Sequence, residues 1–285
     1  MASWLCPPHL RAPIAAIYHF ARTADDIADE GDASPGERLA DLRAYREELR
    51  AAALGSVQPS SRWPEVFGPL AYSIAQFALP EDLLADLLSA FIQDIEKTRD
   101  GGTYADRAEL LDYCRRSANP VGRLLLHLYG VNDAQALAQS DAICSALQLI
   151  NFWQDPRVDL PRGRFYFPLT DCVRRGFTRE SFKVFAPQAD APPPQEAINL
   201  IAVESAWARE LMTQGAPLVH RLPGRAGWEL RFVVQGGLRI LDKIEDLGFD
   251  TFSQRPKIGK TDAPLLVWRA LRMRRQLPPM KALPR

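Results

Sequence analysis

The stretch from residue 14 to residue 30, IAAIYHFARTADDIADE, constrains the fold of this chain most, because it places carboxylates on an apolar helix face. At about 100° per residue, Asp25 and Asp29 fall on or beside the arc of the apolar side chains, and Arg22 extends the polar end of that face. An unpaired carboxylate in an apolar interior costs on the order of tens of kcal/mol in the idealised estimate. The two acids therefore require a cation or a water-filled cavity, unless this helix end emerges into solvent as an ordinary acidic surface.

The composition bounds the class of protein. The 285 residues are 47% hydrophobic, so we expect one domain over residues 1–285 with one substantial core. The 35 Lys and Arg balance the 35 Asp and Glu, so no overall charge favours nucleic acid as a partner. The four cysteines form no CxxC pair, which argues against a zinc site and a disulfide framework. No apolar run approaches about 18 residues and no signal peptide is present, so we expect a cytoplasmic protein, at most peripheral to the inner membrane.

Helical periodicity recurs along the chain and no alternating strand pattern persists, which predicts an all-α fold. We expect the first helix to open at Pro13 and a break near Asn119 and Pro120, where proline removes a backbone donor. The other segments with helical spacing are 37–54, 65–79, 81–99, 105–130, 134–159, 196–219, 227–247 and 264–273.

The segment 134–159 carries a second polar stripe. Counted from Asp141, the side chains of Gln148, Asn151, Asp155 and Asp159 fall within about 80° of arc, while apolar residues cover most of the rest. A helix that is apolar on nearly all sides is buried. We therefore expect this stripe to face an internal cavity rather than solvent.

Two aspartate pairs on separate helices, each spaced i and i+4, form a plausible cage for a divalent metal. Magnesium fits best, because it takes one or two carboxylates together with substrate phosphate oxygens and retains waters. The chemistry this implies is ionisation of a diphosphate ester, with an apolar cavity shielding the carbocation from water. Phe20, Phe152 and Tyr166 are candidates for stabilising that cation through their ring faces.

Four ordered motifs carry a resemblance that covers nearly the whole chain. The motifs are RTADDIADE, YCRRSANPVG, QLINFWQD and GRFYFP, and they resemble those of the squalene and phytoene synthase family. Their sequences are most similar to those of the bacterial hydroxysqualene synthases of the hopanoid pathway. The resemblance implies an isoprenoid-synthase-type helical bundle. In such a bundle, two Asp-rich motifs face each other across a central pocket and hold magnesium and diphosphate.

The resemblance also implies roles for individual residues. The four aspartates are the expected catalytic groups, and with Asn151 they are the expected metal ligands. Arg22 resembles the diphosphate-binding arginine before the first motif. The residues expected to bind the substrate diphosphate are Arg22, Gln148, Asn151, Arg164 and Tyr166, and those expected to bind metal are Asp25, Asp29, Asn151, Asp155 and Asp159.

One departure from the family pattern bears on the reaction. Arg116 stands where the eukaryotic squalene synthases carry a tyrosine that assists condensation of two farnesyl diphosphates. This favours magnesium-dependent conversion of presqualene diphosphate and water to hydroxysqualene, with the substrate handed over by a presqualene diphosphate synthase. The alternatives are head-to-head condensation to squalene or phytoene, and a non-catalytic prenyl-lipid binding or assembly protein.

Two further departures concern the site and its cover. Pro156 separates the aspartates of the second motif and is expected to swing Asp159 off the shared face, leaving three carboxylates. The chain begins close to its first helix, so a leading segment that covers the pocket in the family is expected to be short. The basic tail predicts either transient contact with anionic lipid or a solvated end.

Overall fold

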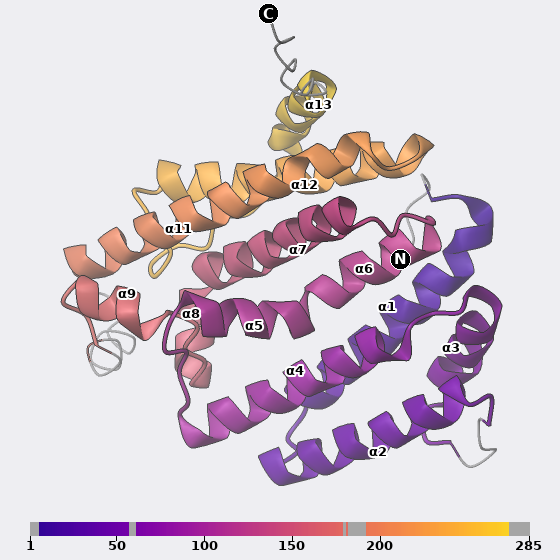
Figure 1. Ribbon diagram of the computed structural model, residues 1–285. Coiled ribbons are helices and arrows are strands. Elements are labelled where there is room, and N and C mark those ends of the chain that lie inside the picture. The colour runs from indigo at the N-terminus through magenta and orange to yellow at the C-terminus, as the bar shows by residue number, and fades with distance from the viewer. Residues whose placement is uncertain (1–5, 57–60, 179–180, 182–191, 274–285) are drawn as a thin grey trace, which may run out of the picture.

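The computed structural model describes residues 6–56, 61–178, 181 and 192–273. These residues form an all-α fold, and an isolated bridge between Tyr104 and Pro168 is the nearest approach to a strand among them. No helix within these ranges is long and apolar enough to cross a membrane. The α-helices are α1 (Pro8–Asp29), α2 (Pro35–Ala53), α3 (Pro64–Phe77), α4 (Glu81–Asp100), α5 (Arg107–Ser117), α6 (Asn119–Leu128), α7 (Ala134–Gln154), α8 (Pro156–Asp159), α9 (Leu169–Arg174), α11 (Gln195–Gly215), α12 (Gly224–Asp246) and α13 (Ala263–Arg272) (Figure 1).

Local chemistry sets most helix ends. Ser34 and Glu37 form a capping box at the start of α2, and the side chains of Asp106 and Asp133 accept backbone N–H groups at the starts of α5 and α7. The expected break near Asn119 is confirmed, since α5 ends at Ser117 and α6 begins at Asn119.

Two expected helix bounds were wrong. The first helix begins at Pro8 rather than at Pro13, which lies inside it. Pro8 suits a helix start because its missing N–H has no partner in the first turn, whereas Pro13 removes one bond that the packed helix tolerates. The helix expected to run to residue 159 ends at Gln154, because Pro156 cannot donate the next helical bond, and a separate short helix α8 follows.

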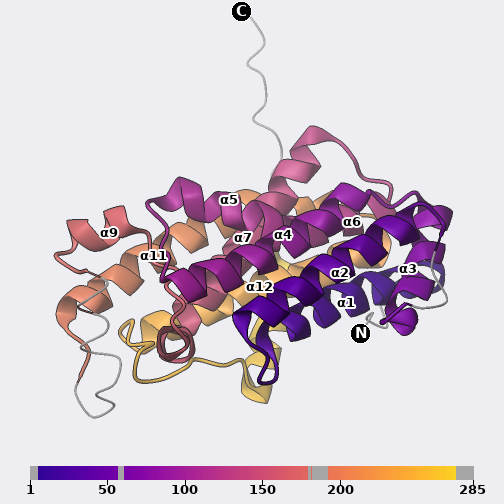
Figure 2. The same ribbon diagram turned by 90° about the horizontal axis from the view of Figure 1, so that it is seen from below.

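The side chains form two hydrophobic cores. The first joins α1, α2, α3 and α4 and includes a stacked pair, Phe20 on Tyr45, with ring centroids 5.2 Å apart. The second surrounds α7, which packs most extensively against α11, and extends to α5, α12 and the segment after α8. Figures 1 and 2 show α7 in the interior, with α11 and α12 on one side of it and α5 and α6 on the other.

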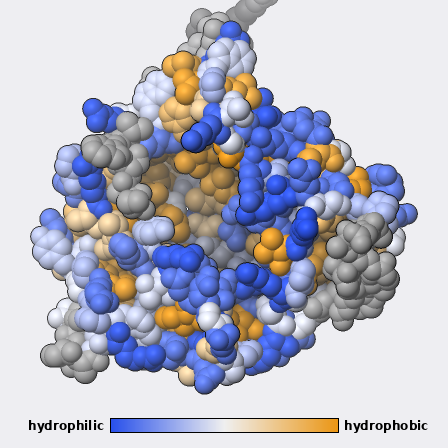
Figure 3. All heavy atoms as spheres, turned by 180° about the vertical axis from the view of Figure 1, so that it is seen from behind, coloured by the Kyte–Doolittle hydropathy of each residue, from blue (hydrophilic) through white to orange (hydrophobic). Residues whose placement is uncertain are grey.

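An apolar cavity of about 620 Å³ lies beside the second core. Ile14 of α1 closes one side, and most of its wall comes from side chains of α6, α7 and α12, with Cys6, Leu218 and Leu222 completing it. Figure 3 shows a hollow on the face opposite to that of Figure 1, with hydrophobic side chains inside its upper part and hydrophilic ones around its rim. The cavity lining includes Val121, Leu125, Ile143, Leu147, Leu230, Phe232 and Val233.

Candidate active site

Helices α1 and α7 each place apolar residues beside the cavity and acids at their C-terminal ends. Ile14 and Leu147 line the cavity, whereas Asp25 and Asp155 come 11 and 8 residues later. At 1.5 Å per residue, the acids lie roughly 16 and 12 Å further along their helices. The two helices run in the same direction (Figure 1). Their acids therefore gather at one end of the bundle, beyond the residues that line the cavity, where the negative ends of the helix dipoles also favour cations.

The first aspartate motif is held by Arg22. The Arg22 guanidinium lies 2.9 Å from a carboxylate oxygen of Asp25 and 2.6 Å from one of Asp26. Burial raises the pKa of Asp25, and the charge of neighbouring Asp29 raises it further. The carboxyl that the sequence placed on the apolar face is thus only half-exposed and carries a destabilised charge in the absence of a further cation.

The second motif is divided by its proline. Asp155 follows the last residue of α7, and Asp159 lies on α8. Burial raises the pKa of Asp159 to about 7, with the charges of Asp155 and Asp29 acting in the same direction and Arg164 opposing them. Asp159 therefore lies near the first motif. Pro156 takes Asp159 off the face of α7, as expected, because α7 ends at Gln154 and Asp159 lies on α8. Asp159 still lies close enough to Asp29 and Arg164 for their charges to affect its pKa.

Arg164 joins the two motifs. It forms an ion pair with Asp29 across 135 positions of sequence, and its charge lowers the pKa of Asp159 and of Asp94. Its side chain is 20% exposed, so this pair is largely shielded from water. The segment after the second motif thus reaches the first motif through Arg164, whose expected contact with the substrate diphosphate stays a prediction.

Asp94 of α4 is a site residue that the sequence reasoning missed. Its carboxylate accepts a hydrogen bond from the hydroxyl of Tyr113 on α5, and burial raises its pKa to about 7. The charges of Asp29 and Asp159 raise that pKa further, so all three carboxylates share one region. The signal was present in the sequence. Asp94 lies seven positions after buried Leu87, on the apolar face of its helix.

The aromatic candidates separate into two places. Tyr166 stacks on Phe152, with ring centroids 3.7 Å apart, and both rings are buried close to Tyr113. The charge of Asp94 adds to burial in raising the pKa of Tyr166 well above its usual value. Phe20 was wrongly expected at the site, since it is fully buried in the other core between α1 and α2.

Asp155 has a partner that the sequence reasoning also missed. Arg255, in the segment after α12, binds both carboxylate oxygens of Asp155, one of them at 2.8 Å. Gln154 donates to the carbonyl of Pro256 and Arg157 to that of Ser253, each at 2.6 Å. These contacts fix the segment over the end of α7. Asp155, like Asp29, is therefore neutralised by an arginine from a distant segment.

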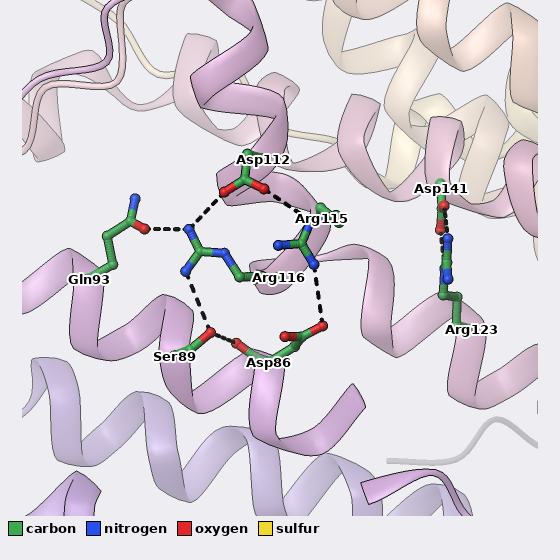
Figure 4. A network of polar contacts seen from close by, with 8 residues as sticks. All are labelled: Asp86, Ser89, Gln93, Asp112, Arg115, Arg116, Arg123 and Asp141. Carbon is green, nitrogen blue, oxygen red and sulfur yellow. Dashed lines mark hydrogen bonds and ion pairs between the residues drawn. The ribbon is translucent and has the colours of Figure 1, made fainter. Parts of the chain in front are cut away.

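The other polar residues of the stripe on α7, Asp141, Gln148 and Asn151, lie in different surroundings. Asn151 is exposed one turn before Asp155 and Gln148 is half-buried, and neither residue lines the cavity. Asp141 instead binds Arg123 through two hydrogen bonds of 2.9 and 2.6 Å (Figure 4). The stripe is enclosed by packing at its start and reaches solvent at its end.

Arg116 is absent from the cavity wall. Its guanidinium binds Gln93 and Ser89 of α4 and lies 3.1 Å from Asp112 of its own helix (Figure 4). Its side chain is only 17% exposed. Arg116, at the position where a tyrosine that assists condensation was expected from the family pattern, thus joins α4 to α5.

The site offers the donor chemistry that magnesium prefers. Asp25, Asp29, Asp94 and Asp159 supply hard carboxylate oxygens. Within the described residues, no three acidic, histidine or cysteine side chains lie close enough together to hold a metal ion by themselves. Because magnesium commonly takes one or two carboxylates and fills its other positions with water and substrate phosphate, these residues fit the ion together with a diphosphate.

The comparisons with known proteins agree with this geometry. The chain is 33% identical over 245 residues to a hydroxysqualene synthase of Sinorhizobium fredii, covering 86% of this chain and 76% of that protein. It is 32% identical to a hydroxysqualene synthase of Rhodopseudomonas palustris over 86% of this chain and 78% of that one. The crystal structure of squalene synthase HpnC from Alicyclobacillus acidocaldarius matches with a TM-score of 0.75 and 34% identity over 86% of each chain. The profile of the squalene/phytoene synthase family matches residues 1–262. The chain therefore belongs to the squalene/phytoene synthase family.

Proposed function

We propose that this protein converts presqualene diphosphate and water to hydroxysqualene and diphosphate in a magnesium-dependent reaction. The observation that carries the proposal is the arrangement of Asp25, Asp29, Asp94 and Asp159 around Arg164 in a bundle that also encloses an apolar cavity of about 620 Å³, with α1 and α7 contributing to both. An amphiphile with a diphosphate head and a long hydrocarbon body matches that division of polar and apolar surface.

The residues of the chain contribute to ionisation by binding and orientation. Arg22 and Arg164 are the arginines that face the first motif, and they are placed to bind diphosphate oxygens. Bound magnesium would neutralise the charge that develops on the leaving group. The C–O bond breaks with its electron pair remaining on diphosphate, and the cyclopropylcarbinyl cation rearranges within the apolar wall.

Capture by water completes the reaction. Water supplies the oxygen of the new C–O bond and loses its proton to the released diphosphate, so no reductant is needed. Asn151 is exposed one turn before Asp155, and this side of the site is where water is proposed to approach the cation. The stacked rings of Phe152 and Tyr166 lie near Asp94 and are placed to stabilise positive charge in the meantime.

The decisive experiment compares substrates. Purified protein is incubated with presqualene diphosphate, with and without magnesium, and in parallel with farnesyl diphosphate. We expect hydroxysqualene from presqualene diphosphate only with magnesium, and loss of at least about 100-fold in kcat with Asp25→Asn. Asp41→Asn is the matched control, because Asp41 also binds an arginine, Arg62, but on the exposed face of α2. Product that forms equally well without magnesium, or turnover unharmed by Asp25→Asn, would contradict the proposal.

Condensation is the second candidate. The chain is 30% identical to a presqualene diphosphate synthase of Zymomonas mobilis over 94% of its own length and 86% of that protein. Presqualene diphosphate formed from farnesyl diphosphate would favour this reaction. The position of Arg116 in a network outside the cavity disfavours it, because no phenol stands at that point. Turnover of neither substrate, with prenyl-lipid binding unaffected by magnesium, would indicate a non-catalytic binding protein.

A further inference from the structure

Helices α12 and α13 expose an apolar surface next to the cavity. The docking surface consists of Trp228, Phe232 and Val233 of α12 with Val267, Trp268 and Leu271 of α13, whose exposed fractions run from 38% to 62%. Isolated apolar side chains are ordinary at a protein surface, whereas six on two helices that pack together, two of them tryptophans, are typical of an interaction site.

The docking surface is continuous with the cavity. Phe232 and Val233 belong both to the exposed group and to the cavity wall, to which Leu230 also contributes. Figure 3 shows hydrophobic side chains gathered along the upper part of the hollow and above it. Phe232 and Val233 therefore join the apolar wall of the cavity directly to the docking surface.

Polar contacts hold α13 in place while its apolar side chains stay open. Arg231 of α12 donates to the carbonyls of Ala270 and Met273 at 2.8 and 2.9 Å, and its guanidinium lies 4.7 Å from the ring centroid of Trp228. Arg269 binds Asp242 of α12 at 2.5 Å. Ala270 alone among the residues of α13 is buried. A ten-residue helix is marginal by itself, so these contacts fix a helix that hardly enters the core.

The positive charge of the C-terminal region indicates what kind of partner the docking surface binds. Residues 263–285 contain six basic residues and no acidic one in a chain whose net charge is zero. Tryptophan favours the boundary between lipid headgroups and acyl chains, and basic residues beside it are attracted to an anionic lipid surface. The basic residues are Arg269, Arg272, Arg274, Arg275, Lys281 and Arg285, the last four outside the described residues.

We infer that the docking surface binds an anionic lipid bilayer and opens the cavity toward its acyl chains. The role of this binding in product release rests on the proposed function, because a hydrocarbon of the size of hydroxysqualene leaves an apolar cavity more readily into lipid than into water. The binding itself stands on the exposed side chains and the charge, and it is measured without substrate. Failure of catalysis and failure of membrane binding are therefore distinguishable.

The test is flotation of the full chain with vesicles of phosphatidylcholine alone or mixed with phosphatidylglycerol. We expect binding to the mixed vesicles, weakened by salt, and a decrease of about tenfold or more in the partition coefficient with Trp268→Ala plus Leu271→Ala. The control is Leu54→Ala plus Val173→Ala, which removes two side chains that are 83% and 71% exposed on other faces. Neither pair changes the net charge, so the difference reports apolar contact.

A second readout guards against misfolding of the variant. Trp268→Phe is compared with wild type for fluorescence quenching by brominated lipid, and we expect the variant to lose a quenched component. Thermal melting of the double variant should match that of wild type. No binding to mixed vesicles would overturn the inference. So would binding that survives the double substitution but disappears on removal of residues 274–285, which would assign the contact to the tail.

Discussion

Asp94 lies outside both aspartate motifs but close to their carboxylates. It accepts a hydrogen bond from Tyr113, and its pKa responds to the charges of Arg164, Asp29 and Asp159. A carboxylate in that position adds negative charge beside the first and second motifs. Because Asp29 and Asp159 are close enough for their charges to affect it, Asp94 is placed to contribute to binding of a cation between the motifs.

We predict that Asp94→Asn lowers kcat for presqualene diphosphate by at least about tenfold, because the amide keeps the hydrogen bond to Tyr113 but removes the charge. The apparent affinity for magnesium should fall as well, which a structural role would not require. Asp86→Asn is the matched control, since Asp86 lies on the same helix and pairs with Arg115 away from the cluster. Unchanged kcat and unchanged magnesium dependence would remove Asp94 from the site.

At the scale of helices, close approach of backbones places the second motif. A Cβ atom at Gly215, the last residue of α11, would lie 2.6 Å from the carbonyl oxygen of Gln139 and 2.9 Å from the amide nitrogen of Ile143. Both atoms belong to the backbone of α7, which cannot move without shifting that helix. The position of Asp155 at the end of α7 thus depends on a glycine 60 residues later.

Gly215→Ala is expected to destabilise the protein by about 1–3 kcal/mol through this overlap. Gly236→Ala provides the comparison, because its Cβ would meet only the side chain of Ile258 at an ordinary 3.7 Å. In the interior of α12 that substitution should be neutral or stabilise by up to about 1 kcal/mol. Urea unfolding of both variants measures the difference. Equal stability of the two variants would show that α7 and α11 can separate freely.

The whole molecule carries buried acids whose ionisation opposes folding. Asp94 and Asp159 have pKa values of about 7 in the folded chain because burial disfavours their charge. Glu204 also has a pKa of about 7 through burial, but it pairs with Arg107 on another part of the molecule. In the unfolded chain all three ionise near pH 4. The folded state therefore binds more protons between about pH 4 and pH 7, and the free energy of unfolding falls as pH rises through that window.

We predict that, without divalent cations, the melting temperature is lower at pH 8 than at pH 5, and that magnesium raises it more at pH 8, where the carboxylates are ionised and bind the cation. Asp159→Asn should flatten the pH profile and weaken the magnesium effect. Glu204→Gln should flatten the profile without altering the response to magnesium. Differential scanning fluorimetry across this range provides the measurement. A magnesium response that is the same at both pH values would refute the link between the cluster and the metal.

The sequence by itself determined the features that depend on local geometry. Helical periodicity placed Asp25 and Asp29 on an apolar face, because 3.6 residues per turn fixes the direction of a side chain from its position alone. The break at Asn119 followed from Pro120 for the same local reason. These expectations hold because each rests on a few consecutive residues.

Only the tertiary structure decided which partners these acids meet. Arg164 reaches Asp29 across 135 residues and Arg255 reaches Asp155 across 100, and neither pairing leaves a periodic signal in the sequence. The effect of Pro156 could be read locally only in part, since the ring ends α7 but the packing of α8 decides where Asp159 points. Side-chain direction is a property of one helix, whereas charge neutralisation depends on how several helices pack together.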